Sequence, residues 1–198
     1  MNIDKNSIKI KIRKESKKQL KQLTDKEKAL KDTLINDRIF CIIQEYKPKF
    51  IGLYFPIKNE VSILRLTEKL LDENYSIFYP RFKREALPSS GYEMSSFSDF
   101  SQLKPGLFNI PEPSQNAYTV QNSAIDLWLI PGLAFSPEGV RLGRGGGYYD
   151  RLLADSCGIK IGVLYECQLM SDIPWETHDI FMDMLIMENK TLNICKIL

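Results

Sequence analysis

The chain contains a single histidine, His178, among its 198 residues, and its four cysteines are scattered without a Cys-x-x-Cys pair. One histidine cannot supply a multi-histidine metal centre, and the cysteine spacing argues against a structural zinc site or a disulfide framework. A Ser-His-Asp triad would have to use His178, which we interpret as a structural residue. The composition therefore points away from zinc chemistry and from triad catalysis.

Long apolar runs are also missing from the sequence. The two longest, residues 39–43 and the interrupted stretch 127–135, fall well short of the ~18 residues that a membrane helix needs. The first residues are polar and lead into a lysine-rich stretch without an apolar signal-peptide region, so we expect a cytoplasmic protein with no membrane partner. Hydrophobic residues nevertheless make up 43% of the chain, which excludes disordered, collagen-like and coiled-coil classes and predicts one domain over residues 1–198.

Positive charge is concentrated near the start of the chain. Residues 1–31 carry eleven Lys or Arg against four acids, a net of +7, whereas the remainder carries sixteen against twenty-one, a net of −5. Residues 7–22 have helical spacing, and Lys9, Arg13 and Lys17 recur every four residues along one side of that helix. This side can present several cations to one anionic partner, either a nucleic acid or a phosphorylated small molecule; the alternative is an ordinary solvated helix face.

A second helix is predicted to follow directly. Thr24 and Glu27 form a capping-box pattern, and Pro48 ends the helical pattern shortly after residue 46. The predicted buried stripe of this helix consists of Ile35, Ile39, Ile42, Ile43 and Tyr46.

The rest of the chain alternates between apolar runs of strand length and helical patterns. Strands are predicted at 50–55, 77–79, 125–130, 159–164, 184–187 and 192–194, helices at 61–74 and 148–155, and a hairpin with loops at 84–116. This order predicts an α/β fold, a single Rossmann-like domain with a mostly parallel sheet, helices on both faces and a basic N-terminal helix. Ligands of such sheets bind beyond the carboxyl ends of the strands, so we expect chemistry in the loops after Phe55, Tyr79 and Ile130.

A glycine-rich loop precedes the helix predicted at 148–155. Five of the eleven glycines lie between residues 139 and 147, which lets backbone N–H groups converge on an anion. The loop matches neither a Walker A motif nor the dinucleotide fingerprint. Arg141 and Arg144 add guanidinium groups suited to phosphate oxygens, and Asp150 is placed to hold a magnesium ion against the same phosphates. The alternative is a flexible turn whose charged residues make surface ion pairs and complement the helix dipole.

Two segments, residues 129–135 (LIPGLAF) and residues 141–151 (RLGRGGGYYDR), closely resemble the signature of the 5-formyltetrahydrofolate cyclo-ligase family, also called 5,10-methenyltetrahydrofolate synthetases. The resemblance extends over nearly the whole chain, from the basic N-terminal helix through residues 54–60, 79–81 and 110–113 to residues 179–188. Two positions depart from the pattern, since Asn109 stands where glycine is usual and Ser136 where aspartate is usual.

The resemblance implies an ATP-dependent ring closure that converts 5-formyltetrahydrofolate into 5,10-methenyltetrahydrofolate and releases ADP and phosphate. Magnesium is the implied cofactor, and ATP and the folate are the implied small-molecule partners of a monomer that binds no nucleic acid. In the implied mechanism ATP phosphorylates the formyl oxygen, N10 attacks the activated carbon, and phosphate leaves. No enzyme nucleophile is required, which suits a chain with one histidine.

Carried over position by position, the resemblance also implies a site. The implied ATP-binding residues are Lys9, Arg13, Arg141, Leu142, Gly143, Arg144, Gly145, Gly146, Gly147, Tyr148 and Tyr149. The implied folate-binding residues are Phe55, Glu60, Arg144, Gly145, Gly146, Gly147 and Tyr148. Arg144 and Tyr148 are the implied catalytic residues because they would border the formyl group, and Asp150 and Asp183 are the implied magnesium ligands.

Two other classes of function compete with this interpretation. A nucleic-acid-binding protein would explain the basic N-terminal segment but would give the glycine loop no role. Another enzyme on a related α/β scaffold, such as a sugar-phosphate isomerase, would explain the fold without needing ATP, since fold alone does not fix activity. Nucleotide binding therefore separates the second alternative from the leading interpretation.

Overall fold

The computed structural model describes residues 4–82, 91–177 and 179–194, and its four described α-helices follow the predicted pattern. These helices are α1 (Lys5–Gln22), α2 (Asp25–Tyr46), α3 (Leu64–Asp72) and α4 (Tyr148–Leu153). The capping box of α2 is confirmed, because Thr24 and Glu27 each bond to the other's backbone N–H. Tyr46 is 48% exposed, so its predicted burial is wrong: it is the last residue of α2, next to the left-handed Lys47 that ends the helix.

Eight strands of the described chain form one sheet, in the order β12-β11-β10-β7-β1-β2-β3-β6. The strands from β11 to β2 in that order pair in parallel, and β12, β3 and β6 pair antiparallel at the two margins, as a mostly parallel sheet requires. The bounds are β1 (Phe50–Gly52), β2 (Ser76–Phe82), β3 (Tyr92–Ser96), β6 (Thr119–Val120), β7 (Leu127–Pro131), β10 (Ile159–Val163), β11 (Met184–Ile186) and β12 (Thr191–Asn193). Two short pairs lie outside this sheet, β4 (Lys104–Pro105) with β5 (Pro111–Glu112) and β8 (Ala134–Phe135) with β9 (Arg141–Leu142).

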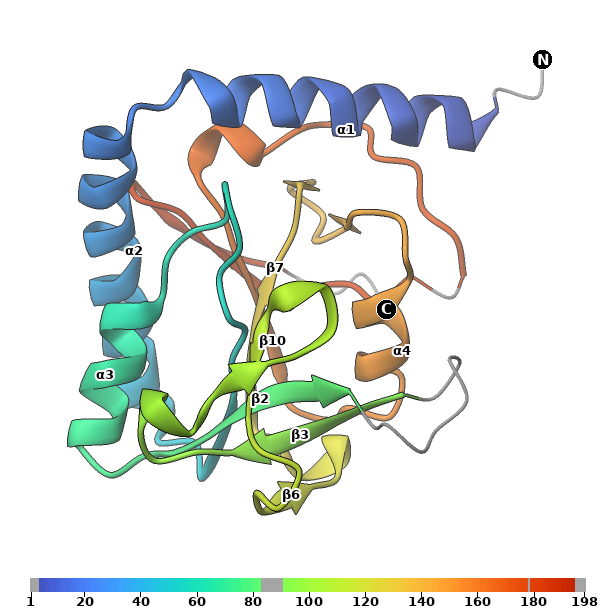
Figure 1. Ribbon diagram of the computed structural model, residues 1–198. Helices are drawn as coiled ribbons and strands as arrows, with labels where there is room; N and C mark the ends of the chain where they lie inside the picture. Colours follow the sequence, from blue (N-terminus) through green and yellow to red (C-terminus); the bar gives the residue numbers. More distant parts are fainter. Residues whose placement is uncertain (1–3, 83–90, 178, 195–198) are drawn as a thin grey trace.

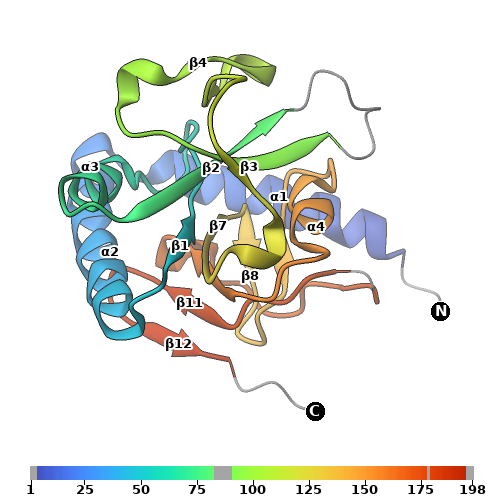
Figure 2. The ribbon, with the colours of Figure 1, turned by 90° about the horizontal axis from the view of Figure 1, so that it is seen from below.

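Helices cover both faces of the sheet, which confirms the predicted three-layer α/β fold. Side chains alternate along each strand, so Ile77 and Tyr79 join the core under α2 and α3, whereas Phe78 joins the core under α4. Figure 2 shows the sheet between α2 and α3 on one side and α4 on the other. No described helix is both long and apolar enough to cross a membrane.

Helix α1 lies across the carboxyl ends of the parallel strands rather than against either face (Figure 1). Ser16 is fully buried, and its hydroxyl donates a hydrogen bond to the carbonyl oxygen of Leu133, just beyond β7. Leu20, one turn further on, is also buried in the core. This docking turns one side of α1 toward the loops in which parallel α/β sheets bind their ligands.

Two predicted strands differ from the structure by three residues at their carboxyl ends, and the other four differ by two residues or fewer at either end. The strand predicted at 50–55 is assigned only as far as Gly52, although the Leu53 N–H still donates to the Phe78 carbonyl oxygen at 2.8 Å. Strand β2 continues past Tyr79, so the loop expected there begins later, outside the described residues. Arg81, within β2, is buried and paired with Glu93 of β3. His178, interpreted as structural, also falls outside the described residues.

Candidate active site

The glycine loop connects β9 to α4 and has the backbone conformation that its composition predicts. Gly145 and Gly147 have φ angles of +104° and +61°, a region that side chains disfavour. Gly145 and Gly146 are exposed, whereas Arg141 and Leu142 at the start of the loop are buried in the β8–β9 pair. The loop therefore presents its backbone to solvent while one of its arginines is fixed underneath.

Arg141 carries its charge inside the protein, with only 4% of its side chain exposed. Its Nη2 lies 3.0 Å from Oδ1 of Asp150, and its guanidinium carbon lies 5.2 Å from the ring centre of Tyr149. The Nε of Arg141 is buried and has no hydrogen-bond partner among the described residues. A buried donor without an acceptor is rare in folded proteins, and at a glycine loop it indicates a site for an anion.

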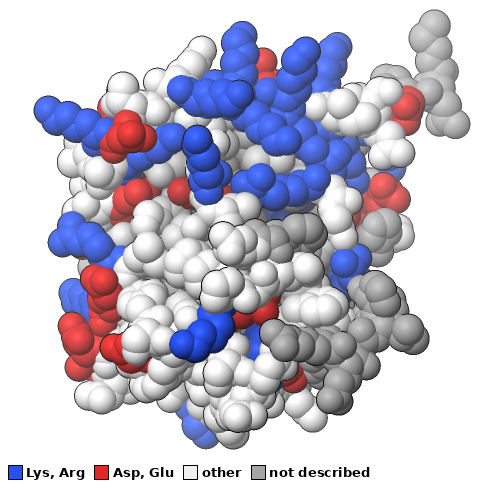
Figure 3. Space-filling view, in the orientation of Figure 1, with Lys and Arg blue, Asp and Glu red and all other residues white. Residues whose placement is uncertain are grey.

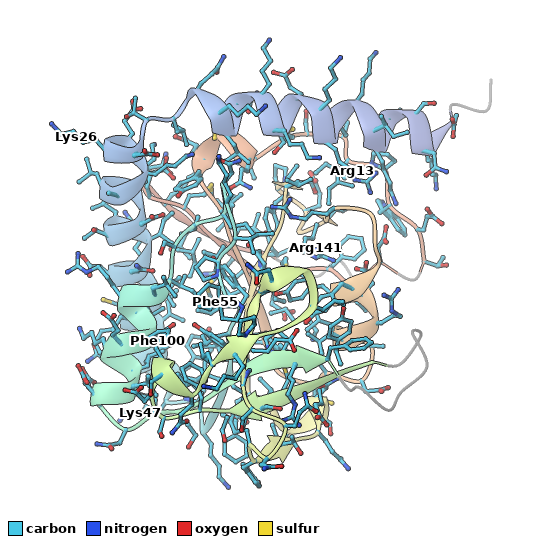
Figure 4. The ribbon with its side chains drawn as sticks, viewed as in Figure 1. Arg13, Lys26, Lys47, Phe55, Phe100 and Arg141 are labelled. Atoms are coloured by element: carbon cyan, nitrogen blue, oxygen red, sulfur yellow. The ribbon has the colours of Figure 1, made fainter. Side chains whose placement is uncertain are left out.

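Helix α1 contributes a second arginine to this loop. The Nε of Arg13 donates to the carbonyl oxygen of Gly143 at 3.0 Å, and Figure 4 shows Arg13 beneath α1, with Arg141 and Phe55 successively further from that helix. The side chain of Lys9 is 12% exposed, so it faces the protein. Its Nζ is already paired with carboxylates, at 3.3 Å from Oε1 of Glu176 and 3.4 Å from Oδ2 of Asp179. The structure therefore brings Arg13 to the glycine loop and pairs Lys9, one turn earlier in α1, with two carboxylates.

The prediction that Lys17 shares this inward side is wrong, because Lys17 is exposed. The spacing of four residues drifts around the helix, so a third residue in such a series leaves the face on which the first one lies. Figure 3 shows Lys and Arg side chains gathered over α1 and extending below it.

Glu60 faces the glycine loop from the segment between β1 and α3. Its Oε1 lies 3.5 Å from Nη2 of Arg144, and its side chain is 10% exposed while that of Arg144 is 47% exposed. Burial raises the pKa of Glu60, and the hydrogen bond from the Ile57 N–H and the positive charge of Arg144 oppose that rise only in part. A shielded carboxylate beside an exposed arginine can accept hydrogen bonds from a ligand that lies between them.

Aromatic rings surround these charged groups. Phe55 is half-buried and meets Tyr79 edge-on with ring centres 6.1 Å apart, and Tyr148 packs against Tyr92 at 4.0 Å. Burial raises the pKa of Tyr148 well above its ordinary value, so its hydroxyl stays protonated at neutral pH. Tyr148 can therefore donate a hydrogen bond and is unsuited to act as a base. Sequence reasoning missed Tyr92, because β3 lies within the region predicted as a hairpin with loops.

The two aspartates expected to bind magnesium lie in different surroundings. Asp150 is bonded to Arg141 beside the glycine loop, and 28% of its side chain is exposed. Asp183 precedes β11, and its Oδ2 accepts the Lys160 backbone N–H at 2.8 Å, near the amino end of β10. Within the described ranges, no cluster of three or more metal-ligating side chains is present. The structure thus brings Asp150 to the candidate site and does not bring Asp183 there.

These features define an α/β protein with a glycine-rich loop over a buried arginine and a shielded carboxylate beside that loop. Comparison with known proteins identifies the family to which this arrangement belongs. Residues 5–188 match the model of the 5-formyltetrahydrofolate cyclo-ligase family, and the chain belongs to that family.

Individual relatives agree with the family match in sequence and in fold. An NMR structure of the 5,10-methenyltetrahydrofolate synthetase from Aquifex aeolicus matches with a TM-score of 0.82 and 31% identity, over 94% of this chain and 93% of that one. A 5-formyltetrahydrofolate cyclo-ligase from Haemophilus influenzae is 29% identical over 183 residues, which cover 88% of this chain and 95% of its own. Another, from Mycoplasma pneumoniae, is 30% identical over 192 residues, which cover 93% of this chain and 98% of its own.

Proposed function

We propose that the chain catalyses the ATP-dependent conversion of 5-formyltetrahydrofolate into 5,10-methenyltetrahydrofolate, with release of ADP and phosphate. Family membership supports the overall reaction. The observation that carries the residue assignment is the 3.5 Å approach of Glu60 to Arg144. This contact joins the carboxylate proposed to recognise the folate to the loop proposed to hold the phosphates, so the two substrates would meet where phosphoryl transfer has to occur.

The glycine loop and the arginines beneath it form the proposed ATP site. Arg141 and Arg13 supply fixed cations, and Gly143 to Gly147 supply backbone N–H groups that a side chain would otherwise cover. Tyr149, stacked on Arg141, belongs to the same site. Lys9 remains a proposed phosphate ligand, and on binding it would exchange one of its two carboxylate partners for a phosphate oxygen.

The proposed folate site lies on the other side of Arg144. Phe55 offers an aromatic face for the flat pterin, and Glu60 accepts hydrogen bonds from pterin nitrogens. Burial of Glu60 strengthens each such hydrogen bond, because a hydrogen bond to a carboxylate is electrostatically stronger inside a protein than in water. The aromatic ring and the carboxylate together would hold the formyl group toward Arg144 and Tyr148.

In the proposed chemistry, the formyl oxygen attacks the terminal phosphoryl group of ATP and ADP leaves. N10 then attacks the activated formyl carbon and closes the ring, and loss of the N10 proton and expulsion of phosphate give the methenyl product. Arg144 is exposed, and among the described residues its contact is the 3.5 Å one to Glu60, so its guanidinium can move with the negative charge on the transferred phosphoryl group. Tyr148 donates a hydrogen bond from its protonated hydroxyl, in keeping with its raised pKa.

Asp150 fits the donor set that magnesium needs beside a nucleotide. Mg²⁺ keeps several waters and takes one or two carboxylates besides the phosphate oxygens, so a single partly exposed aspartate next to Arg141 suffices. Bound there, the ion would neutralise negative charge on the phosphates. Asp183 instead fixes the backbone between β10 and β11 through Lys160, and we leave it out of the proposed metal site.

Three further proposals complete this assignment. We propose that the protein acts in the cytoplasm, as a monomer, without a nucleic acid or membrane partner. A relative from Arabidopsis thaliana is named as mitochondrial.

The direct test is an assay of the purified protein with 5-formyltetrahydrofolate, Mg²⁺ and ATP, in which the near-ultraviolet absorbance of the methenyl product is followed against an ATP-free control. We expect ATP-dependent growth of that absorbance. Arg144→Ala should lower kcat by more than about tenfold without unfolding the protein, because one charge contact to the transition state is lost. Wild-type turnover in a folded Arg144→Ala variant would remove Arg144 from its proposed role.

A further inference from the structure

A polar stripe on α2 binds the segment that carries Glu60. Lys28, Asp32 and Asn36 lie on three successive turns of the helix, and each of them bonds to the segment 59–62. The Nζ of Lys28 donates to Oδ1 of Asn59 at 3.0 Å. Asn36 Nδ2 donates to the carbonyl oxygen of Ser62, also at 3.0 Å. The segment from Phe55 to Ser62 is therefore attached to α2 on both sides of Glu60.

Asp32 occupies the centre of this stripe and makes two bonds through one oxygen. Its Oδ1 accepts the backbone N–H of Ser62 at 3.1 Å and the hydroxyl of Tyr165 at 2.7 Å. Tyr165 lies two residues beyond the end of β10 and is 1% exposed. One carboxylate thus ties α2 to the Glu60 segment and to the carboxyl end of a central strand.

The segment between these attachments is a tight turn that fixes the Glu60 side chain. The Glu60 N–H donates to the carbonyl oxygen of Ile57 at 2.9 Å, and Oε2 of Glu60 accepts the Ile57 N–H at 3.2 Å. Asn59 has a φ of +71°, which is strained for most residues and is held by its bond to Lys28. The remaining oxygen of Glu60 faces Arg144. A shift of this turn against α2 would change the distance from that oxygen to Arg144 of the glycine loop.

We propose that Asp32 is a positioning residue for the folate-recognising carboxylate, because it clamps the Glu60 turn between α2 and Tyr165 and so sets the distance from Glu60 to Arg144. Asp32 contacts neither proposed substrate and acts through Glu60. The effect of Asp32 on folate binding rests on the proposed function, whereas the bonds from Asp32 to Ser62 and Tyr165 are present in the protein without ligands.

The test compares Asp32→Ala with Asp32→Asn, Tyr165→Phe and the control Asp37→Ala, an exposed aspartate on the same helix. In Asp32→Ala we expect the Kd for 5-formyltetrahydrofolate, measured by calorimetry, to rise about tenfold while the Kd for ATP changes less than about twofold. Asp32→Asn keeps an oxygen at the same place and should recover binding to within about threefold of wild type. Tyr165→Phe should give an intermediate rise, and Asp37→Ala none.

Amide hydrogen exchange of the ligand-free protein provides the second readout. Asp32→Ala should speed exchange in peptides covering 56–63 at least tenfold and leave those covering β2 unchanged. Equal losses of ATP and folate affinity, or wild-type folate affinity with unchanged exchange at 56–63, would overturn the proposal. If the wild-type protein binds no folate, the proposed function fails, and the exchange measurement still decides whether Asp32 holds the turn.

Discussion

Arg141 shows how a single residue can link the stability of the protein to its ligand. Its guanidinium is buried, and Asp150 is the carboxylate bonded to it, while its Nε has no partner among the described residues. Burying a charge has a large desolvation cost that one ion pair offsets incompletely. A phosphate oxygen would supply a second acceptor and a second negative charge. We therefore propose that a nucleotide phosphate completes the environment of Arg141.

Asn109 is a second residue whose identity matches the backbone conformation at its position. It stands where the family usually has glycine, and its φ is +60°, in the left-handed region. Asparagine tolerates this region better than most other residues with a Cβ, which explains why it can occupy this position.

Glu60→Gln should weaken folate binding and change its pH dependence. The pKa of Glu60 is raised above 4.5 by burial, so a fall in pH neutralises this carboxyl earlier than an ordinary one. We expect the folate Kd of the wild type to rise as pH falls through that raised pKa, and the Gln variant to lack this component. Calorimetric titrations of both proteins between pH 7 and pH 5 check this, and parallel curves would contradict it.

The Glu60 carboxyl affects stability with the opposite pH dependence: folate binding should weaken as pH falls, whereas the free energy of unfolding should decrease as pH rises. Because its folded pKa lies above its unfolded value, the folded state binds the proton more tightly, and the unfolding free energy falls as pH rises from the unfolded pKa to the folded one. Glu60→Gln should remove this component, as measured by urea denaturation over the same pH range. The variant should also keep its ATP affinity, since equal loss of both ligands would indicate misfolding.

Helix α1 presents different sides to the site and to solvent. Arg13 points inward to the glycine loop, whereas the neighbouring Lys14 is exposed. This contrast offers a matched pair of substitutions on adjacent residues of one element.

Arg13→Gln should raise the Kd for ATP about tenfold, because a charge-assisted contact to phosphate is worth about 1.4 kcal/mol or more. Lys14→Gln removes the same formal charge from the exposed side and should leave the Kd within about twofold, since exposed charges are screened by salt. Nucleotide binding measured by calorimetry at 0.15 M salt distinguishes the two. Equal weakening in both variants would mean that α1 acts only through its overall charge.

The glycine loop offers a second matched pair. Gly145 has a φ of +104°, whereas Gly146 lies outside the left-handed region and an added Cβ there would meet nothing within 4 Å. Gly145→Ala should therefore lower the unfolding free energy by about 1–2 kcal/mol, and Gly146→Ala should change it by less than about 0.5 kcal/mol. Urea denaturation of both variants checks this difference. Equal effects would show that the loop relaxes freely around either substitution.

At the scale of the whole molecule, the candidate site joins segments that are far apart in the chain. Arg13 comes from α1, Glu60 from the segment after β1, and Arg141 from β9, and they meet at the carboxyl ends of the parallel strands. Ligands that bridge these segments should stabilise the fold as a unit, because they bind the folded state and not the unfolded chain.

A non-hydrolysable ATP analogue with Mg²⁺, at about a hundred times its Kd, should raise the Tm by roughly 5–10 °C. Adenosine at the same concentration is the matched control and should raise the Tm much less, because it lacks the phosphates that the arginines are proposed to bind. Thermal unfolding followed by circular dichroism measures both shifts. Equal shifts would show that the basic loop does not contribute to nucleotide binding.

The sequence by itself determined the local structure of this protein. The capping box at Thr24 and Glu27, the strand–helix–strand unit of β1, α3 and β2, and the glycines of positive φ all follow from short-range patterns. Such patterns can be predicted from sequence because capping, turn preferences and hydrophobic periodicity involve residues that are close in the chain. The motif at residues 141–151 also predicted the family, and the family match over residues 5–188 confirms that prediction.

Only the tertiary structure decided which residues meet. Glu60 and Arg144 are 84 positions apart, and Lys9 finds its partners 167 and 170 positions away. The exposure of Lys17 and the bond from Lys160 to Asp183 depend likewise on how α1 docks and how β10 pairs with β11. These contacts depend on the order of strands in the sheet and on the packing of helices against it. No single stretch of sequence determines the strand order or the helix packing, because both depend on burying the apolar surface of the whole chain together.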